Sequence, residues 1–327
     1  MNVRNILAIT CGAAVALASR AIADEVRVES HPVNQLLGAE VLLRIPEKRP
    51  TGLLVLLPAG NIHSYDEQGG YTPSALPRML ATNGVVTLVA AARPGLGAAV
   101  GLYAGDEILE ELHRLIDDVL QKCQIPEGRV AIGGFSAGGI GAVRYAEFCK
   151  RDEHRAKSIV AVFAVDAPLD YERWFLASEL ELKRLALAGR DDAEDRSATN
   201  YLAKTFGGSP REAVAAYRRQ SVVTTLVADG GNARLLKDTS IRIYIEPDVK
   251  WRLENWNQDL DSSNIPDAVA LINIVRLLGN KDATLITTSG KGRRTDGTRN
   301  PHSWSIVDEP DLAGWLMTLY ESLESRR

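Results

Sequence analysis

Short runs of apolar residues, each separated from the next by a stretch of helical character, constrain the fold of this chain more than any other feature. Such runs occupy residues 52–57, 85–91, 129–134, 158–165, 240–245 and 283–288. A run that is apolar on both faces suits a strand buried inside a parallel sheet. Strands alternating with helices at this spacing imply crossover connections and a mainly parallel sheet. We therefore expect an α/β fold, with two further strands at 25–30 and 39–45.

The helices that alternate with these strands are predicted from the spacing of their apolar residues. Residues 106–123 are the clearest case, because apolar side chains recur at intervals of three and four and form one face. Asp106 and Glu107 at the start and Lys122 near the end match the helix dipole. Further helices are expected at 72–83, 137–150, 266–278 and 310–323.

The alternation breaks between about residues 170 and 236. This stretch is charge-rich and helical in character, and it reads as a cap inserted into the sheet domain. We therefore expect one domain over residues 24–327 that carries this insertion.

The first 23 residues have the layout of a secretory signal peptide. Arg4 precedes an apolar run at 6–18, and Ala21-Ile22-Ala23 forms a small-x-small cleavage motif. The run is too short to span a bilayer comfortably, which disfavours a membrane anchor. We expect cleavage near Ala23, a secreted or periplasmic protein, and no stable membrane insertion.

The net charge of −4, without basic clusters, disfavours binding to nucleic acid. The chain has no His-Glu-x-x-His motif and no cysteine cluster, so we expect neither a metal nor another cofactor. The oligomeric state is left open.

The segment that carries chemistry is Gly134-Phe135-Ser136-Ala137-Gly138, a G-x-S-x-G pattern. It directly follows a predicted strand and opens a predicted helix, the setting that a nucleophile elbow requires. Gly134 and Gly138 supply the lack of bulk that the sharp turn needs. The pattern predicts Ser136 as nucleophile, with the Ala137 amide as an oxyanion donor. A glycine-rich phosphate loop is the alternative, but this turn contains no lysine.

Through this segment the chain resembles the α/β-hydrolase superfamily, from the strand at 53–57 to the final helix. The resemblance implies a mainly parallel sheet flanked by helices and a chain order of nucleophile, acid and histidine. It implies no particular substrate.

The implied order excludes three of the five histidines (His31, His63 and His113) as the general base. His154 lies in a charged stretch and is expected to be solvated. His302 follows the last predicted strand, where the family places its base. We therefore expect His302 to activate Ser136.

The resemblance also implies an acid after the strand at 240–245. Asp248 is favoured because it lies in the turn beyond that strand, and Glu246 is the alternative. The second oxyanion donor is expected in the loop after the strand at 53–57, from the amide of Gly60 or Asn61.

Two cysteines remain after the predicted signal peptide, Cys123 and Cys149. Export would permit a disulfide between them, and two separate buried thiols are the alternative. Among the aromatic residues, Trp251 and Trp304 have the best claims to line a cleft, because each lies near a predicted site residue.

These residues favour a serine hydrolase that cleaves a carboxylic ester through an acyl-enzyme, with a small-molecule or oligomeric ester as substrate. An aminopeptidase or oligopeptidase, or an acyltransferase, would use the same triad. A non-catalytic binding protein on this fold is the alternative from another class.

Overall fold

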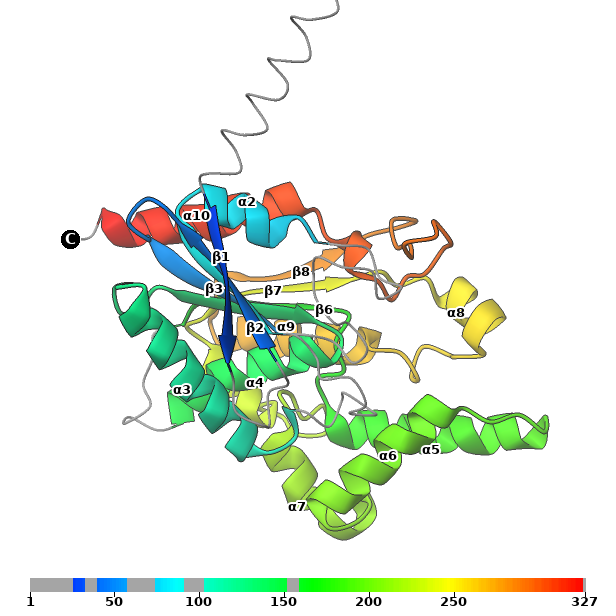
Figure 1. Ribbon diagram of the computed structural model, residues 1–327. Helices are drawn as coiled ribbons and strands as arrows, with labels where there is room; N and C mark the ends of the chain where they lie inside the picture. The colour runs from blue at the N-terminus through cyan, green and yellow to red at the C-terminus, as the bar shows by residue number, and fades with distance from the viewer. Residues whose placement is uncertain (1–25, 33–39, 58–73, 91–102, 152–158, 326–327) are drawn as a thin grey trace, which may run out of the picture.

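The computed structural model describes residues 26–32, 40–57, 74–90, 103–151 and 159–325 (Figure 1). Within these ranges, eight strands form one sheet in the order β1-β2-β4-β3-β5-β6-β7-β8. The pairs β1–β2 and β2–β4 are antiparallel, and all other neighbours are parallel. The strands are β1 (Val26–Pro32), β2 (Glu40–Pro46), β3 (Gly52–Leu57), β4 (Val85–Ala90), β5 (Val130–Phe135), β6 (Ile159–Val165), β7 (Ser240–Ile245) and β8 (Ala283–Thr287).

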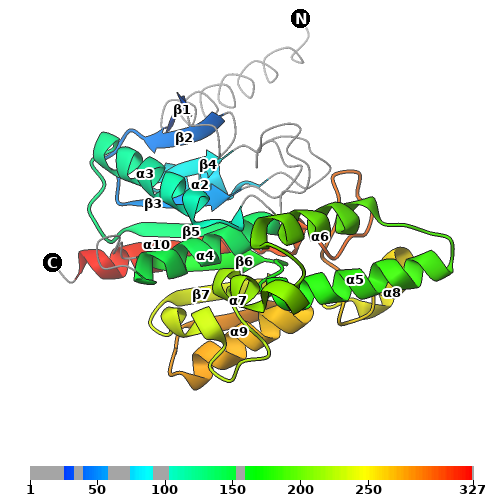
Figure 2. The same ribbon diagram turned by 90° about the horizontal axis from the view of Figure 1, so that it is seen from below.

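The sheet confirms the predicted fold class, and each predicted strand lies within two residues of the observed one. Helices cover both faces, as Figures 1 and 2 show. Helices α3 (Asp106–Lys122), α4 (Ala137–Arg151) and α9 (Ile265–Leu277) lie on one face. Helices α2 (Leu76–Thr82) and α10 (Glu309–Glu324) lie on the other. One helix was not predicted, the short α8 (Val249–Trp256) that follows β7.

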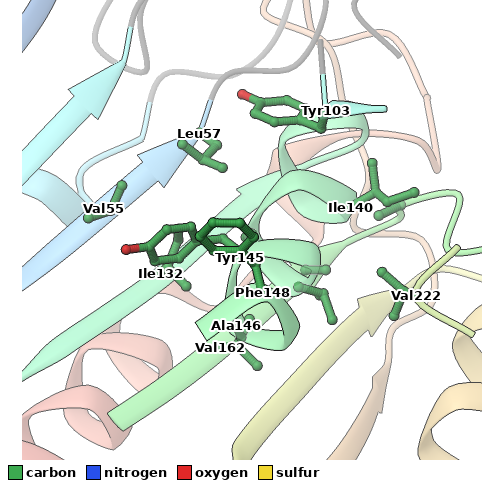
Figure 3. Packing of buried hydrophobic residues seen from close by; sticks show 14 of the residues in the cluster. Val55, Leu57, Tyr103, Ile132, Ile140, Tyr145, Ala146, Phe148, Val162 and Val222 are labelled. Carbon is green, nitrogen blue, oxygen red and sulfur yellow. The ribbon is translucent and has the colours of Figure 1, made fainter. Parts of the chain in front are cut away.

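The central strand β3 shows why its sequence is apolar throughout. Leu53, Val55 and Leu57 belong to the core under α3 and α4, whereas Leu54 and Leu56 belong to the core under α2 and α10. Because side chains alternate along a strand, a strand covered on both faces needs apolar residues at every position. Burying one such side chain contributes about 1.5–3 kcal/mol. Figure 3 shows residues of the α4 side, with Val55, Ile132 and Val162 on the strands and Ile140, Tyr145 and Phe148 on α4.

The segment between β6 and β7 is helical, with α5 (Tyr171–Leu187), α6 (Ala193–Phe206), α7 (Pro210–Gln220) and the 3₁₀ helix η3 (Gly231–Leu236). Asp170 caps α5 by accepting hydrogen bonds from the backbone amides of Glu172 and Arg173. In both views, α5 extends away from the sheet layers (Figures 1 and 2). The role of this segment as a cap over a binding site stays a prediction.

The disulfide considered between Cys123 and Cys149 does not form in this structure, where both residues are buried thiols. Cys123 follows the end of α3 and Cys149 lies in α4, and both pack into the same apolar core. Burial raises the pKa of the Cys123 thiol, which keeps it protonated and poorly nucleophilic. The alternative of two separate thiols is the one observed.

The predicted signal peptide, residues 1–23, lies outside the described residues. None of the helices that the structure describes has both the length and the apolar character needed to cross a membrane.

Candidate active site

Ser136 occupies the turn between β5 and α4, and its backbone has a φ of 52°. This left-handed conformation is rare outside glycine and costs about 1–3 kcal/mol, so the surrounding structure must hold it. The Ser136 amide donates to the carbonyl of Val165 at 2.8 Å. A Cβ atom at Gly134 would lie 2.5 Å from the backbone carbon of Gly138. The elbow therefore needs glycine at position 134, for the steric reason expected from the sequence.

Ala137 is the first residue of α4. A backbone amide in the first turn of a helix has no acceptor within that helix. Its N–H is therefore available to an oxyanion that develops beside Ser136, and the helix dipole favours negative charge there. The other predicted donors, Gly60 and Asn61, fall in a part of the chain that is not described.

His302 lies in the long loop between β8 and α10, and its side chain is 19% exposed. Its Nε2 atom is 3.2 Å from the Ser136 hydroxyl oxygen, and its Nδ1 atom is 2.9 Å from Oδ2 of Asp166. A carboxylate only accepts hydrogen bonds, so Nδ1 carries the proton and donates to Asp166. Nε2 then keeps its lone pair and can accept the Ser136 proton. This is the arrangement that a general base requires.

Two of the four histidines that were not expected to act as the base are described, and both belong to other parts of the fold. His113 lies on α3, where its Nδ1 is within hydrogen-bond distance, 3.1 Å, of the Tyr145 hydroxyl. His31 is in β1, at the far edge of the sheet. His63 and His154 lie outside the described ranges.

The prediction of the acid was wrong. The carboxylate bonded to His302 belongs to Asp166, the residue immediately after β6, and to neither Asp248 nor Glu246. The hydrogen-bond ladder explains this, because the end of β6 adjoins the end of β5 directly. Ser136 pairs with Val165, and Asp166 in turn donates its amide to the carbonyl of Tyr244 at 2.8 Å. The end of β7 lies one strand farther from Ser136 than the end of β6.

The two predicted acids are engaged elsewhere. Asp248 caps the start of α8 by accepting from the Trp251 amide at 3.0 Å, and it pairs with Arg299 at 2.8 Å. Glu246 is buried and also pairs with Arg299. Its Oε2 atom accepts from the backbone amides of Lys291 and Gly292 at 3.0 and 3.1 Å. Both carboxylates therefore stabilise the segments around the site and make no contact with His302.

One sequence signal could have pointed to Asp166. It is the first polar residue after a buried apolar strand, a place where parallel strands collect functional side chains. Its φ of 40° is left-handed, which aspartate tolerates better than most residues. The side-chain amide of Asn264 donates to its carbonyl at 2.8 Å. These contacts hold the backbone of Asp166 beneath His302.

Asp166 is completely buried and also bonds to Arg252, whose Nη2 atom lies 2.7 Å from Oδ2. Burial by itself would raise the pKa of the carboxyl group, but Arg252 and His302 outweigh it and lower the pKa to about 2. Asp166 is therefore ionised at any pH at which His302 can act as a base. Arg252 was not singled out from the sequence, because nothing local distinguishes it from the many other arginines.

Two aromatic rings pack against the ring of His302. The His302 ring lies 4.7 Å from that of Phe135 and 6.3 Å from that of Trp256, measured between centroids. Trp251 packs edge-to-face on Trp256 at 4.9 Å. Trp304 is almost entirely buried in the core, where its indole N–H donates to Glu309, and it also borders a hollow together with Ser305 and Val307. The rings that pack on His302 thus come from β5 and α8.

Within the described ranges, no group of three or more histidine, cysteine, aspartate or glutamate side chains is placed to hold a metal ion.

No protein-family model matches this chain, and no curated protein matches its sequence. Solved structures do match it. The MPT51 protein of Mycobacterium tuberculosis is 15% identical with a TM-score of 0.55, and the match covers 90% of this chain and 98% of that one. Esterase B from Lactobacillus rhamnosis is 14% identical with a TM-score of 0.57, over 97% and 95% of the two chains. The acylaminoacyl peptidase of Pyrococcus horikoshii is 14% identical with a TM-score of 0.56.

The match to the peptidase covers 94% of this chain but 43% of the peptidase. Together with the strand order, these likenesses show that the chain has the α/β-hydrolase fold. Identities this low establish the fold alone, and the activity has to be argued from the site.

Proposed function

We propose that this protein is a serine hydrolase that cleaves a carboxylic ester through an acyl-enzyme intermediate. Ser136 is the nucleophile, His302 the general base, and Asp166 the acid that orients His302. The strongest support is the continuous hydrogen-bonded series from Ser136 through His302 to Asp166, with distances of 3.2 and 2.9 Å. The two hydrogen-bond partners of His302, Ser136 and Asp166, follow the ends of neighbouring strands, and both have left-handed backbone conformations.

The reaction follows from these positions. His302 Nε2 takes the proton from the Ser136 hydroxyl as its oxygen attacks the ester carbonyl. The Ala137 amide donates to the oxyanion, at the positive end of the α4 dipole. His302 then passes the proton to the departing alcohol, which leaves the acyl group on Ser136. Water then attacks the acyl carbonyl as His302 takes its proton, and the bond to Ser136 breaks as His302 returns that proton to the serine oxygen, which releases the carboxylic acid. Asp166 stabilises the imidazolium each time it forms.

An ester is favoured over a peptide bond by the extent of the structural matches. The chain spans 95% of the Lactobacillus esterase, whereas it matches less than half of the Pyrococcus peptidase. The match to the esterase thus extends over nearly all of both chains. A small-molecule ester is the simplest substrate of this kind.

Hydrolysis of p-nitrophenyl acetate and butyrate tests the proposal, with Ser136→Ala and His302→Ala as paired variants. We expect turnover by the unchanged protein and a loss of about 10⁴-fold or more in kcat/KM for either variant. Both variants should retain the far-UV circular dichroism of the unchanged protein. Failure of the unchanged protein to hydrolyse these esters and to react with a fluorophosphonate would favour a binding protein on the hydrolase fold.

We further propose that the protein is exported, on the basis of the signal-peptide layout of residues 1–23. Expression of the full chain in a Gram-negative host, followed by osmotic shock and intact-mass measurement, tests this. A periplasmic product that starts at Asp24 is the expected result, and an uncleaved cytoplasmic product would contradict it.

A further inference from the structure

Arg252 is a buried cation placed directly on the carboxylate that orients His302. Its side chain is 3% exposed and that of Asp166 is fully buried. Arg252 Nη2 and His302 Nδ1 bond to the same oxygen, Oδ2 of Asp166, at 2.7 and 2.9 Å. The guanidinium and the imidazole therefore lie within about 6 Å of one another, close enough for strong electrostatic coupling.

The position of Arg252 is set by the helix that carries it. Its backbone amide donates to the carbonyl of Asp248 at the start of α8, and its Nη1 atom donates to Gln258 at 3.4 Å. The guanidinium carbon lies 5.4 Å from the centroid of the Trp256 ring. That same ring contacts His302 edge-on. Arg252 is thus held from several sides while it faces Asp166.

Two cations that share one carboxylate oxygen compete for its charge. When His302 gains a proton, its positive charge is stabilised by Asp166 but opposed by the permanent charge of Arg252. Arg252 consequently makes proton uptake by His302 less favourable than Asp166 alone would. The neutral imidazole is the form that accepts the Ser136 proton.

The other groups around this pair are the same in the unchanged protein and in variants of Arg252, so they do not alter the comparison between them. Besides Arg252 and His302, the contact to Asp166 from the segment before α9 is the neutral amide of Asn264, made to the backbone carbonyl. The rings against His302 come from Phe135 and Trp256 and are uncharged. The nearby carboxylates of Glu246 and Asp248 share one cation, Arg299, so this cluster keeps a net negative charge, and Arg252 variants leave it unchanged.

We propose that Arg252 is a positioning residue that holds Asp166 ionised and in place and extends the working range of His302 as a base to more acidic pH. The catalytic part of this inference rests on the proposed hydrolysis. The electrostatic part concerns only the protonation of His302 and can be measured without turnover.

The experiment is an NMR titration of the His302 imidazole in the unchanged protein, Arg252→Gln and Arg252→Lys, with the His302 signal assigned by its loss in His302→Ala. In R252Q we expect the midpoint of the His302 titration to rise by about one pH unit, because the opposing charge is gone. In R252K the charge remains, so the midpoint should stay within about 0.3 units of the unchanged protein. Arg242→Gln is the matched control, because Arg242 pairs with Asp311 rather than with Asp166.

The pH profile of kcat/KM gives the second readout. Its acidic limb should move to higher pH in R252Q and keep its place in R252K, while kcat falls about tenfold in both because Asp166 loses the charge-assisted hydrogen bond from Arg252 Nη2. A merely structural role would lower kcat and leave the acidic limb unmoved.

Equal midpoints in R252Q and the unchanged protein would overturn the proposal, as would equal upward shifts in R252Q and R252K. Should R252Q fail to fold, Arg252→Met takes its place, because it also removes the charge and should show the same rise in the His302 midpoint. If the unchanged protein did not hydrolyse esters, the proposed hydrolysis would be overturned. The His302 titration would still test the electrostatic effect of Arg252.

Discussion

The ends of β6 and β7 carry the same kinds of side chain, but these side chains have different partners. Each strand is followed by a buried carboxylate, Asp166 after β6 and Glu246 after β7, and each carboxylate is paired with an arginine. Asp166 bonds to the ring of His302, whereas Glu246 bonds to the backbone of the loop that leads toward His302. One carboxylate orients the base and the other anchors the segment that presents it. The carboxylates at two neighbouring strand ends thus have separate roles: one orients the His302 ring and the other holds the loop that carries it.

The sharpest way to break this comparison is to neutralise each carboxylate in turn and measure kcat/KM. For Asp166→Asn we expect a loss of about 10³–10⁴-fold, because an amide facing Nδ1 no longer selects the productive tautomer of His302. For Glu246→Gln we expect a loss of about tenfold or less. If the two variants lost activity equally, the division of tasks between the strand ends would be wrong.

The second prediction concerns stability rather than rate. Glu246→Gln removes the buried ion pair with Arg299 and weakens the hydrogen bonds to the 288–292 segment. We expect the free energy of unfolding to fall by about 1–3 kcal/mol, because the amides of Lys291 and Gly292 lose their charged acceptor, although Arg299 keeps Asp248 as a partner. Urea denaturation followed by tryptophan fluorescence measures this. A loss below about 0.5 kcal/mol would show that the carboxylate does not anchor the loop.

The third prediction uses the lowered pKa of Asp166, about 2 against an ordinary value of 3.8. A carboxyl group whose pKa is depressed by folding stabilises the protein above its unfolded pKa, and that stability is lost as the pH falls through its folded pKa. Asp166 therefore contributes about 2 kcal/mol above pH 4, which disappears between about pH 4 and pH 2. Unfolding measured against pH should be less steep over this range in Asp166→Asn than in the unchanged protein. Equal slopes would contradict the assignment.

The smallest effect is expected at Asp248, the third carboxylate of this edge. Its side chain is 34% exposed, and it caps α8 and shares Arg299 with Glu246. Asp248→Asn keeps a capping side chain, so we expect about 0.5–1 kcal/mol less stability and a kcat/KM within about threefold. A hundredfold loss of activity would instead restore Asp248 as the acid.

Much of the fold could be predicted from residues close together in the chain. The strands were recognisable because a parallel strand covered on both faces must be apolar throughout, as β3 and β5 are. The elbow at Ser136 was recognisable because its strain and its glycine requirement arise within five residues. Helix α8 was missed because it is a short helix with little apolar periodicity of its own.

The sequence by itself determined the alternating α/β fold, the elbow that presents Ser136, and the loop that carries His302. Tertiary structure decided that Asp166 rather than Asp248 meets His302, that Arg252 shares the same oxygen, and that Cys123 and Cys149 form no disulfide. The physical reason is how far apart in the sequence the interacting residues lie. Backbone conformation and side-chain alternation are set by neighbours in the chain, whereas the partner of His302 lies 136 positions away and is chosen by which strand ends lie side by side.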